Sequence, residues 1–126
     1  MAEALRRRAE RFGRRGEWLA ALWLLVTLHR IRAVRAKTPV GEIDLIASRG
    51  RQLIFVEVKS RASAAERDMA FGSVSQRRIS AAARYWLATH PRLAGHDLRF
   101  DVIGLAPFSR PVHLKGAFEA GSGEWR

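Results

Sequence analysis

The chain has 126 residues and carries 23 basic against 12 acidic side chains, a formal net charge of +11. This length suffices for one domain with a hydrophobic core and is too short for two. Cysteine is absent, which excludes disulfides and thiolate metal sites and fits a reducing cytoplasm. The basic excess favours a polyanionic partner, of which nucleic acid is the leading class.

Arginine supplies nearly all of this positive charge, since Lys37, Lys59 and Lys115 are the only lysines. A planar guanidinium group can bind two phosphate oxygens at once, which supports a phosphate-bearing partner. An arginine bias can also reflect codon usage in a GC-rich genome. The charge alone therefore does not identify the partner.

Residues 2–27 are expected to form a helix, because apolar side chains recur at helical spacing with arginines on the other face. The segment from Trp18 to Leu28 resembles a signal peptide. It is too short to span a bilayer, however, and it lacks a small-residue cleavage site. We expect a buried helix with Trp18 and Trp23 in the core and no membrane partner. Export or a role at a membrane surface is the less favoured alternative.

Three strands are expected next, over residues 28–36, 41–48 and 52–60, the first of them an exposed edge strand. Gly50 and Arg51 fit a two-residue hairpin turn between the second and third strands. This turn would place Arg49 opposite Gln52, and counting outward would place Asp44 opposite Glu57 and Glu42 opposite Lys59. Directly opposed Cβ atoms lie roughly 4.5–5.5 Å apart, so four charges would share one patch.

The second half of the chain is expected to begin with a long mobile loop over residues 62–74. Ser75 is a suitable N-cap for a helix over residues 76–89. Its expected apolar stripe consists of Ile79, Ala82, Ala83, Trp86 and Leu87. A strand over residues 97–105, a turn between Pro107 and Pro111, and a short strand over residues 112–114 should follow. We expect one domain over residues 1–120 and a flexible tail over residues 121–126.

The charged side chains on the second and third strands need a physical reason, because charges in core strands are rare unless they are paired or bind a metal. Asp44 and Glu57 form the carboxylate pair that Mg²⁺ or Mn²⁺ prefers, and the Val58 carbonyl could add a third oxygen. A divalent cation there would neutralise a phosphodiester and lower the pKa of an attacking water. Lys59, on the same face as Glu57, could orient that water or stabilise charge on the phosphorane.

Asp44 followed by Glu57-Val58-Lys59 resembles the PD-(D/E)xK nuclease superfamily, which has the restriction-endonuclease-like fold. The segments GEIDLIA and FVEVKSR, the helix from Gln76, and the segments RFDV and KGAF more closely resemble the YraN-like family of uncharacterised bacterial proteins. This resemblance covers residues 16–118. It departs from the superfamily pattern at Ile43, which stands where a proline often precedes the aspartate. Ser75 stands where a lysine often precedes the glutamine in the YraN-like family.

The resemblance implies an α/β fold of three layers, with an αβββαβ core and a central mixed sheet. It also implies a Mg²⁺- or Mn²⁺-dependent endonuclease acting on DNA more than RNA, selective for branched or junction structure. Holliday-junction resolvases of this superfamily carry a glutamate on the first helix, and Glu17 occupies that place. They act as dimers, so a homodimer is expected by analogy.

Each candidate also has a structural alternative. Asp44 and Glu57 could form structural ion pairs with Lys59 and an arginine, and Lys59 could pair with Glu42 across the hairpin. Glu17 could lie on a solvated helix face or pair with a buried arginine. Glu42 is expected to support the site rather than to bind a metal.

Further candidates are polar residues near the two motifs. Gln76 could orient a phosphate or water, or be an ordinary first-turn residue. Arg61, Arg77 and Arg78 are candidate phosphate contacts. Asp101 is expected to be a structural ion-pair or capping residue, and the four histidines show no metal-ligand spacing.

Two rival functions remain open. A non-catalytic nucleic-acid-binding module of the same fold would bind DNA without dependence on magnesium or Asp44. An interaction protein using its basic helix on an acidic partner or membrane surface would show no preference for DNA over other polyanions.

Overall fold

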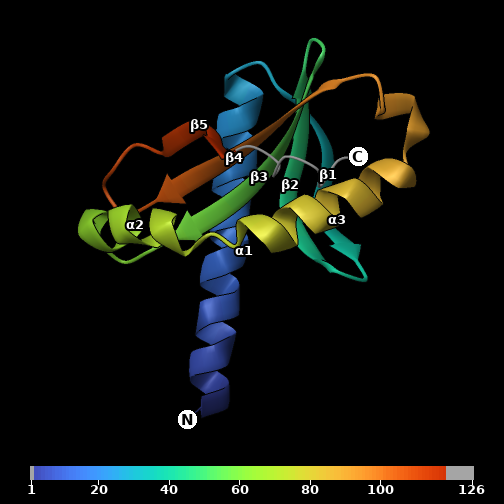
Figure 1. Cartoon of the computed structure of the whole chain (residues 1–126). Helices are drawn as coiled ribbons and strands as arrows, with labels where there is room; N and C mark the ends of the chain where they lie inside the picture. Colours follow the sequence, from blue (N-terminus) through green and yellow to red (C-terminus); the bar gives the residue numbers. More distant parts are fainter. Residues whose placement is uncertain (1, 119–126) are drawn as a thin grey trace.

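The computed structural model describes the backbone of residues 2–118 and the side chains of residues 2, 3 and 15–118 (Figure 1). Its elements follow in the order α1 (Ala2–Val26), β1 (Arg30–Thr38), β2 (Gly41–Arg49), β3 (Gln52–Ser60), α2 (Ala64–Ala70), α3 (Gln76–Ala88), β4 (Asp97–Leu105) and β5 (Val112–Phe118). Short 3₁₀ turns at Phe71–Ser73 and Pro91–Leu93 precede and follow α3. The expected tail over residues 121–126 lies outside the described residues.

The five strands form one sheet in the order β1-β2-β3-β4-β5. Neighbouring strands are antiparallel except β3 and β4, which are parallel. A parallel pair needs a long crossover, and the segment holding α2 and α3 provides it. The expected mixed sheet and the αβββαβ order are confirmed, with α2 and β5 added to that core.

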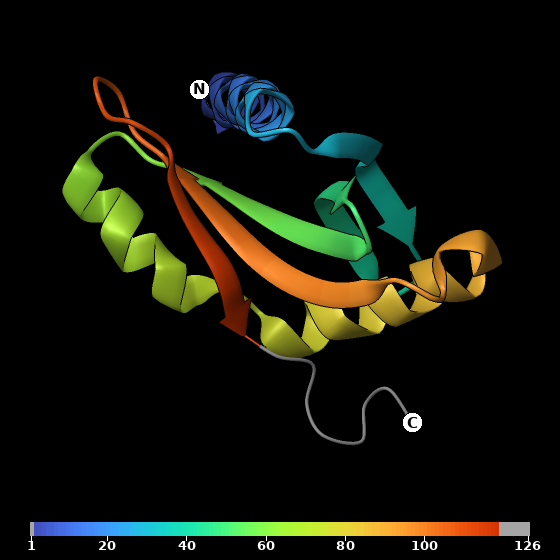
Figure 2. The same ribbon diagram turned by 90° about the horizontal axis from the view of Figure 1, so that it is seen from above.

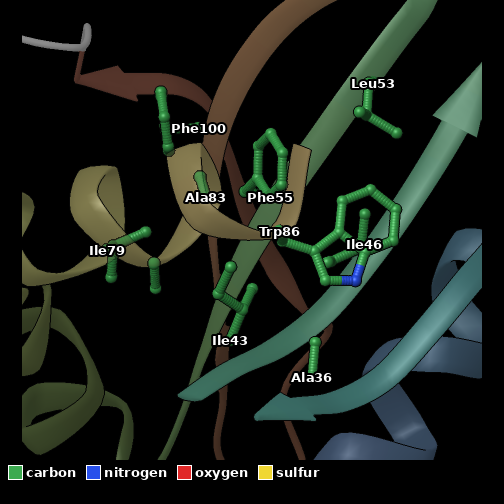
Figure 3. Close-up of a cluster of buried hydrophobic side chains, with 10 residues drawn as sticks. Ala36, Ile43, Ile46, Leu53, Phe55, Ile79, Ala83, Trp86 and Phe100 are labelled. Carbon is green, nitrogen blue, oxygen red and sulfur yellow. The ribbon is translucent and has the colours of Figure 1, made fainter. Parts of the chain in front are cut away.

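Helices cover both faces of the sheet, so the fold has three layers (Figure 2). Ala20, Ala21 and Leu24 of α1 pack against one face, over Leu45 and Val56 among others. On the other face α3 buries the predicted stripe that includes Ile79, Ala82, Ala83 and Trp86 against Phe55, Phe100 and the aliphatic residues of β2 and β3 (Figure 3). Side chains alternate along β3 and from Leu45 to Ala47 of β2, which lets one hairpin serve both cores.

The hairpin between β2 and β3 has the predicted two-residue turn. Gly50 adopts φ of +59°, a left-handed conformation that glycine reaches without steric cost. The observed register runs from Arg49–Gln52 to Leu45–Val56, as the turn predicts. This turn therefore fixes the register, and with it which residues of β2 and β3 lie opposite one another.

The segment over residues 62–74 is helical for much of its length, so the expected mobile loop is wrong. The Ser63 Oγ accepts a hydrogen bond from the Glu66 N–H (3.1 Å) and caps α2. Gly104 lets this segment approach the sheet, because a Cβ there would lie 2.5 Å from Phe71 Cζ. The small residues lack a clear helical period, and contact with β4 supplies the missing stabilisation.

The last strand is longer than expected, since β5 extends from Val112 to Phe118 rather than ending at Leu114. A ring contact explains part of this extension, because the Phe118 ring stacks on Phe100 with centroids 4.9 Å apart. Gly116 (φ +60°) marks an irregular point of the strand, and its N–H donates to Asp101 Oδ1. Val112 and Leu114 alone suggested a strand, and the sequence does not show the long-range partners of Gly116 and Phe118.

The end of α1 is not buried all round, which corrects the expectation that Trp18 belongs to the core. Its indole is 72% exposed, and so are large parts of five further apolar side chains, Leu19, Leu22, Leu25, Val26 and Leu28. A single helix on one face of a sheet buries only the stripe that meets the strands. Within residues 2–118, no helix combines the length and apolar character needed to cross a membrane.

Candidate active site

The candidate site lies where β2 and β3 separate. Main-chain pairing ends at Leu45–Val56, so Asp44 and Glu57 are not a ladder pair, although they are next in register. The Val58 N–H instead donates to Asp44 Oδ2 (2.8 Å). The Asp44 carboxyl group thus replaces a strand carbonyl and lies in the gap between the two strands.

Asp44 and Glu57 are close enough for the Glu57 charge to raise the cost of ionising Asp44. Burial raises the pKa of Asp44 to about 7, and the Glu57 charge adds to the effect. Burial also raises the pKa of Glu57, which is only 8% exposed, against the opposing effect of Lys59. A carboxyl pair that resists ionisation in a partly closed site is typical of functional positions.

Two positively charged side chains lie near this pair, Lys59 on β3 and Arg78 on α3. The Lys59 Nζ lies 3.7 Å from Glu57 Oε1, with both side chains largely buried. Lys59 therefore pairs with Glu57, on its own strand, and not with Glu42 across the hairpin. Arg78 on α3 packs over Gly41, where an added Cβ would lie 3.0 Å from Arg78 Cγ, and its charge lowers the pKa of Glu57.

Arg35 is a site residue that the sequence reading missed. It has φ of +51°, a left-handed conformation that is costly for a side chain larger than glycine. Its neighbours Val34 and Ala36 pair with Leu45 and Ile43, which places Arg35 level with Asp44 on the adjacent strand. Arg35 is one of three arginines in this edge strand, and nothing in the sequence marks it for such a conformation.

The Arg35 Nε donates to Glu17 Oε2, an ion pair between β1 and α1. This bond raises the pKa of Arg35, and the charge of Asp44 contributes to the same shift. The pair is the structural alternative foreseen for Glu17, a partnership with an arginine. Glu17 nevertheless lies near the site, since its charge also raises the pKa of Asp44.

The remaining candidates lie at or beyond the rim of the site. Glu42 is exposed and lies opposite Lys37 of β1 in the strand register, and within residues 2–118 no ion pair joins it to Lys59, so the expected patch of four converging charges is wrong. Gln76 is exposed in the first turn of α3, and within residues 2–118 no hydrogen bond joins its side chain to the carboxyl pair. Arg77 is exposed on the same helix, and Arg61 donates to the carbonyl of Ser60 (2.8 Å).

The carboxyl pair matches the ligands of one kind of metal ion. No group of three or more His, Cys, Asp or Glu side chains among the described residues could hold a metal. Structural zinc needs four protein ligands, and this donor set does not supply them. Magnesium binds through one or two carboxylates and keeps several waters, so Asp44 and Glu57 fit it and the similar Mn²⁺.

Asp101 forms a second buried charge cluster, between β4, β5 and α1. It accepts hydrogen bonds from Arg99, from His113 Nε2 (2.7 Å) and from the Gly116 N–H. Burial alone would raise its pKa, but these hydrogen bonds lower it. The Trp23 Nε1–H donates to His113 Nδ1 (3.2 Å), which ties α1 to the sheet. The structural role predicted for Asp101 is confirmed, while its histidine partner was not foreseen.

The motifs at this site recur in a family of known sequences. A model of the uncharacterised protein family UPF0102 matches residues 16–105. A UPF0102 protein of Mesorhizobium japonicum is 48% identical over 115 residues, which are 91% of this chain and 92% of that protein. A UPF0102 protein of Erythrobacter litoralis is 49% identical over 111 residues, 88% of this chain and 95% of that protein. The chain therefore belongs to the UPF0102 family, as its resemblance to YraN-like proteins led us to expect.

Proposed function

We propose that this chain is a metal-dependent endonuclease that hydrolyses phosphodiester bonds in DNA. The observation that carries the proposal is the Asp44–Glu57 pair, held together in a partly buried gap against its own electrostatic cost. A structural pair of carboxylates would be expected to have an arginine partner each. Among the described residues, Arg35 and Arg78 form no ion pair with either carboxylate and act on the pair through their charge at longer range. Glu57 has Lys59 as its ion-pair partner, and Asp44 accepts a hydrogen bond from the Val58 N–H and shares one with Glu57 itself.

The residues of the site have different proposed roles in this reaction. Asp44, Glu57 and the Val58 carbonyl are the proposed ligands, and a bound Mg²⁺ or Mn²⁺ would neutralise phosphate charge and lower the pKa of a water. Lys59, held beside Glu57, is placed to stabilise the charge that builds on the phosphorane. Glu17 and Arg35 hold α1 and β1 together beside the pair.

Arginines at the rim supply the proposed contacts to the substrate. Arg78 reaches the site from α3, and Arg77 is exposed beside it on the same helix. Such contacts position a phosphate backbone and carry no base sequence. We therefore propose recognition of DNA structure, such as a branch or junction, in repair or recombination. We also propose action in the cytoplasm, which the absence of cysteine supports.

A cleavage assay on branched and linear DNA, with and without Mn²⁺, tests this proposal. Asp44→Asn and Lys59→Ala should each abolish cleavage. The matched control is Glu42→Gln, which removes an exposed carboxylate from the same strand and should leave cleavage intact. Cleavage that survives Asp44→Asn and Lys59→Ala would remove the site assignment. Salt-sensitive DNA binding without cleavage, indifferent to Mn²⁺ and to Asp44→Asn, would identify the non-catalytic module instead.

We propose a homodimer. A groove between α1 and the loop that joins β4 to β5 offers a surface for the second copy. This apolar groove of about 420 Å³ is lined by α1 and by the loop between β4 and β5. Phe108 in that loop is fully exposed, with φ of +58°. A two-fold axis could seat each copy's Phe108 in the other's groove, within an interface of about 800 Å² per partner. Sedimentation equilibrium should show a dimer for the unaltered chain and a monomer for Phe108→Ser; a monomer in both contradicts the proposal.

A further inference from the structure

A small cavity adjoins the candidate site on the side of α1 that faces β1. It has a volume of about 260 Å³ and is lined by Glu17, Trp18 and Ala21 of α1 and by Val34 and Arg35 of β1. Two of these residues, Glu17 and Arg35, form the ion pair beside Asp44. Two residues of the cavity wall are therefore close enough to Asp44 to act on it through their charge.

The wall of this cavity presents a flat aromatic surface to solvent. Trp18 is 72% exposed, and Val34 opposite it on β1 is 46% exposed. Trp18 is the largest side chain at the cavity. An exposed indole of this kind can stack on a nucleobase of any sequence, because every base has a π-face.

Arg35 brings a phosphate-binding group to the same cavity. Among the described residues its guanidinium makes one hydrogen bond, from Nε to Glu17, and its two terminal nitrogens make none. A guanidinium with two terminal N–H groups available suits a phosphate oxygen pair. The cavity thus offers an aromatic face and an arginine donor, the two groups that single-stranded nucleic acid needs.

We propose that Trp18 is a stacking platform for one unpaired base next to the phosphate that is cut, with Arg35 on the adjoining phosphate. The proposal rests on the proposed nuclease function and narrows its substrate to a strand with at least one base outside a duplex. A base inside continuous duplex DNA has both faces covered by its neighbours and cannot reach the indole. The site then prefers a branch, flap or single-stranded segment because the base is already free.

Binding is measured with the Asp44→Asn chain, which should hold DNA without cutting it, by fluorescence anisotropy of a labelled oligothymidylate. Trp18→Ala should weaken binding roughly tenfold or more, and Trp18→Phe should restore most of it because phenylalanine still stacks. Leu25→Ala is the matched control, since Leu25 is an exposed apolar residue of the same helix outside the cavity. It should leave the affinity unchanged.

The second probe is a strand of the same length with abasic sugars in place of thymidine, which keeps the phosphates and removes the bases. Trp18→Ala and the parent chain should bind it equally, and Trp18 fluorescence, isolated by comparison with Trp18→Phe, should be quenched by the thymidine strand alone. Equal loss of affinity for both strands would mean that Trp18 is structural and would overturn the proposal.

The remaining outcomes separate this proposal from the nuclease itself. If cleavage depends on Mn²⁺ and Asp44 while Trp18→Ala binds and cuts like the parent, only the stacking proposal fails. If the chain neither binds nor cuts DNA, the nuclease proposal fails and the stacking proposal with it. If Trp18→Ala and Leu25→Ala both turn a dimer into a monomer without a base-dependent effect, this face belongs to a second copy and the stacking proposal is wrong.

Discussion

Replacing Asp44 by asparagine should stabilise the metal-free protein at alkaline pH. The ionised form of this carboxyl group is disfavoured by burial and by Glu57, so its pKa rises from 3.8 to about 7. Asparagine has the same shape and no charge, and its side-chain oxygen can still accept the hydrogen bond from the Val58 N–H. The substitution therefore removes an electrostatic cost while it keeps the local geometry.

The magnitude follows from the shift in pKa. A rise of about three pH units, at ~1.4 kcal/mol per unit, corresponds to at most about 4 kcal/mol. Asp44 is only partly buried, so solvent screening reduces this value, and a gain of about 2–4 kcal/mol in the free energy of unfolding is expected at pH 8.

The raised pKa of Asp44 also determines how the free energy of unfolding changes with pH. Below about pH 4 Asp44 is protonated in both the folded and the unfolded state, so it costs nothing. Between pH 4 and 7 the folded state holds the extra proton, and the free energy of unfolding falls as pH rises. Above pH 7 the full cost is present. The difference between Asp44→Asn and the parent should thus be near zero at pH 4 and largest at pH 8.

Urea unfolding in EDTA at pH 4, 6 and 8 measures this difference. The matched control is Glu42→Gln, an exposed carboxylate on the same strand, which should change the free energy of unfolding little at any of these values. If Asp44→Asn is less stable than the parent at pH 8, the carboxylate is stabilising. The reasoning about a strained pair is then refuted.

Two further substitutions test the packing of the α2 segment on the sheet and the second charge cluster. Gly104→Ala should lower the melting temperature, because the new Cβ would lie 2.5 Å from Phe71 Cζ and 2.8 Å from Arg67 Cγ, whereas Gly72→Ala has open space and should change it little; equal melting temperatures contradict the close packing. Asp101→Ala leaves Arg99 without its carboxylate partner and should lower the free energy of unfolding by about 3–5 kcal/mol in urea. A loss below 1 kcal/mol would show that the cluster contributes little.

Much of the fold could be predicted because local signals and burial agree. The Gly50 turn, the alternation along β2 and β3 and the apolar stripe of α3 each follow from short-range chemistry. The resemblance to the PD-(D/E)xK superfamily implied the mixed sheet, and its αβββαβ core agreed with the order of elements expected from the residues. The helical segment over residues 62–74 and the full length of β5 were not predicted, because both depend on contacts between residues far apart in the chain. Gly104 makes room for Phe71, and Phe100 stacks on Phe118, which the spacing of residues cannot show.

The site was predicted in part for the same reason. Asp44, Glu57 and Lys59 were found because two charged strands in a core are conspicuous in any sequence. Arg35 was missed because its position depends on its own left-handed backbone conformation in an edge strand. Trp18 was wrongly expected in the core because α1 packs on the sheet with one face only, and its other apolar side chains stay exposed.

Proton release on metal binding tests the central claim most directly. A cation held by Asp44 and Glu57 must displace the proton that Asp44 retains near pH 7. Calorimetric titration with Mn²⁺ at pH 7 should give binding heats that change with the ionisation enthalpy of the buffer, and the change should vanish at pH 9. Asp44→Asn should not bind. Buffer-independent heats at pH 7, or unaltered binding by Asp44→Asn, would contradict the account.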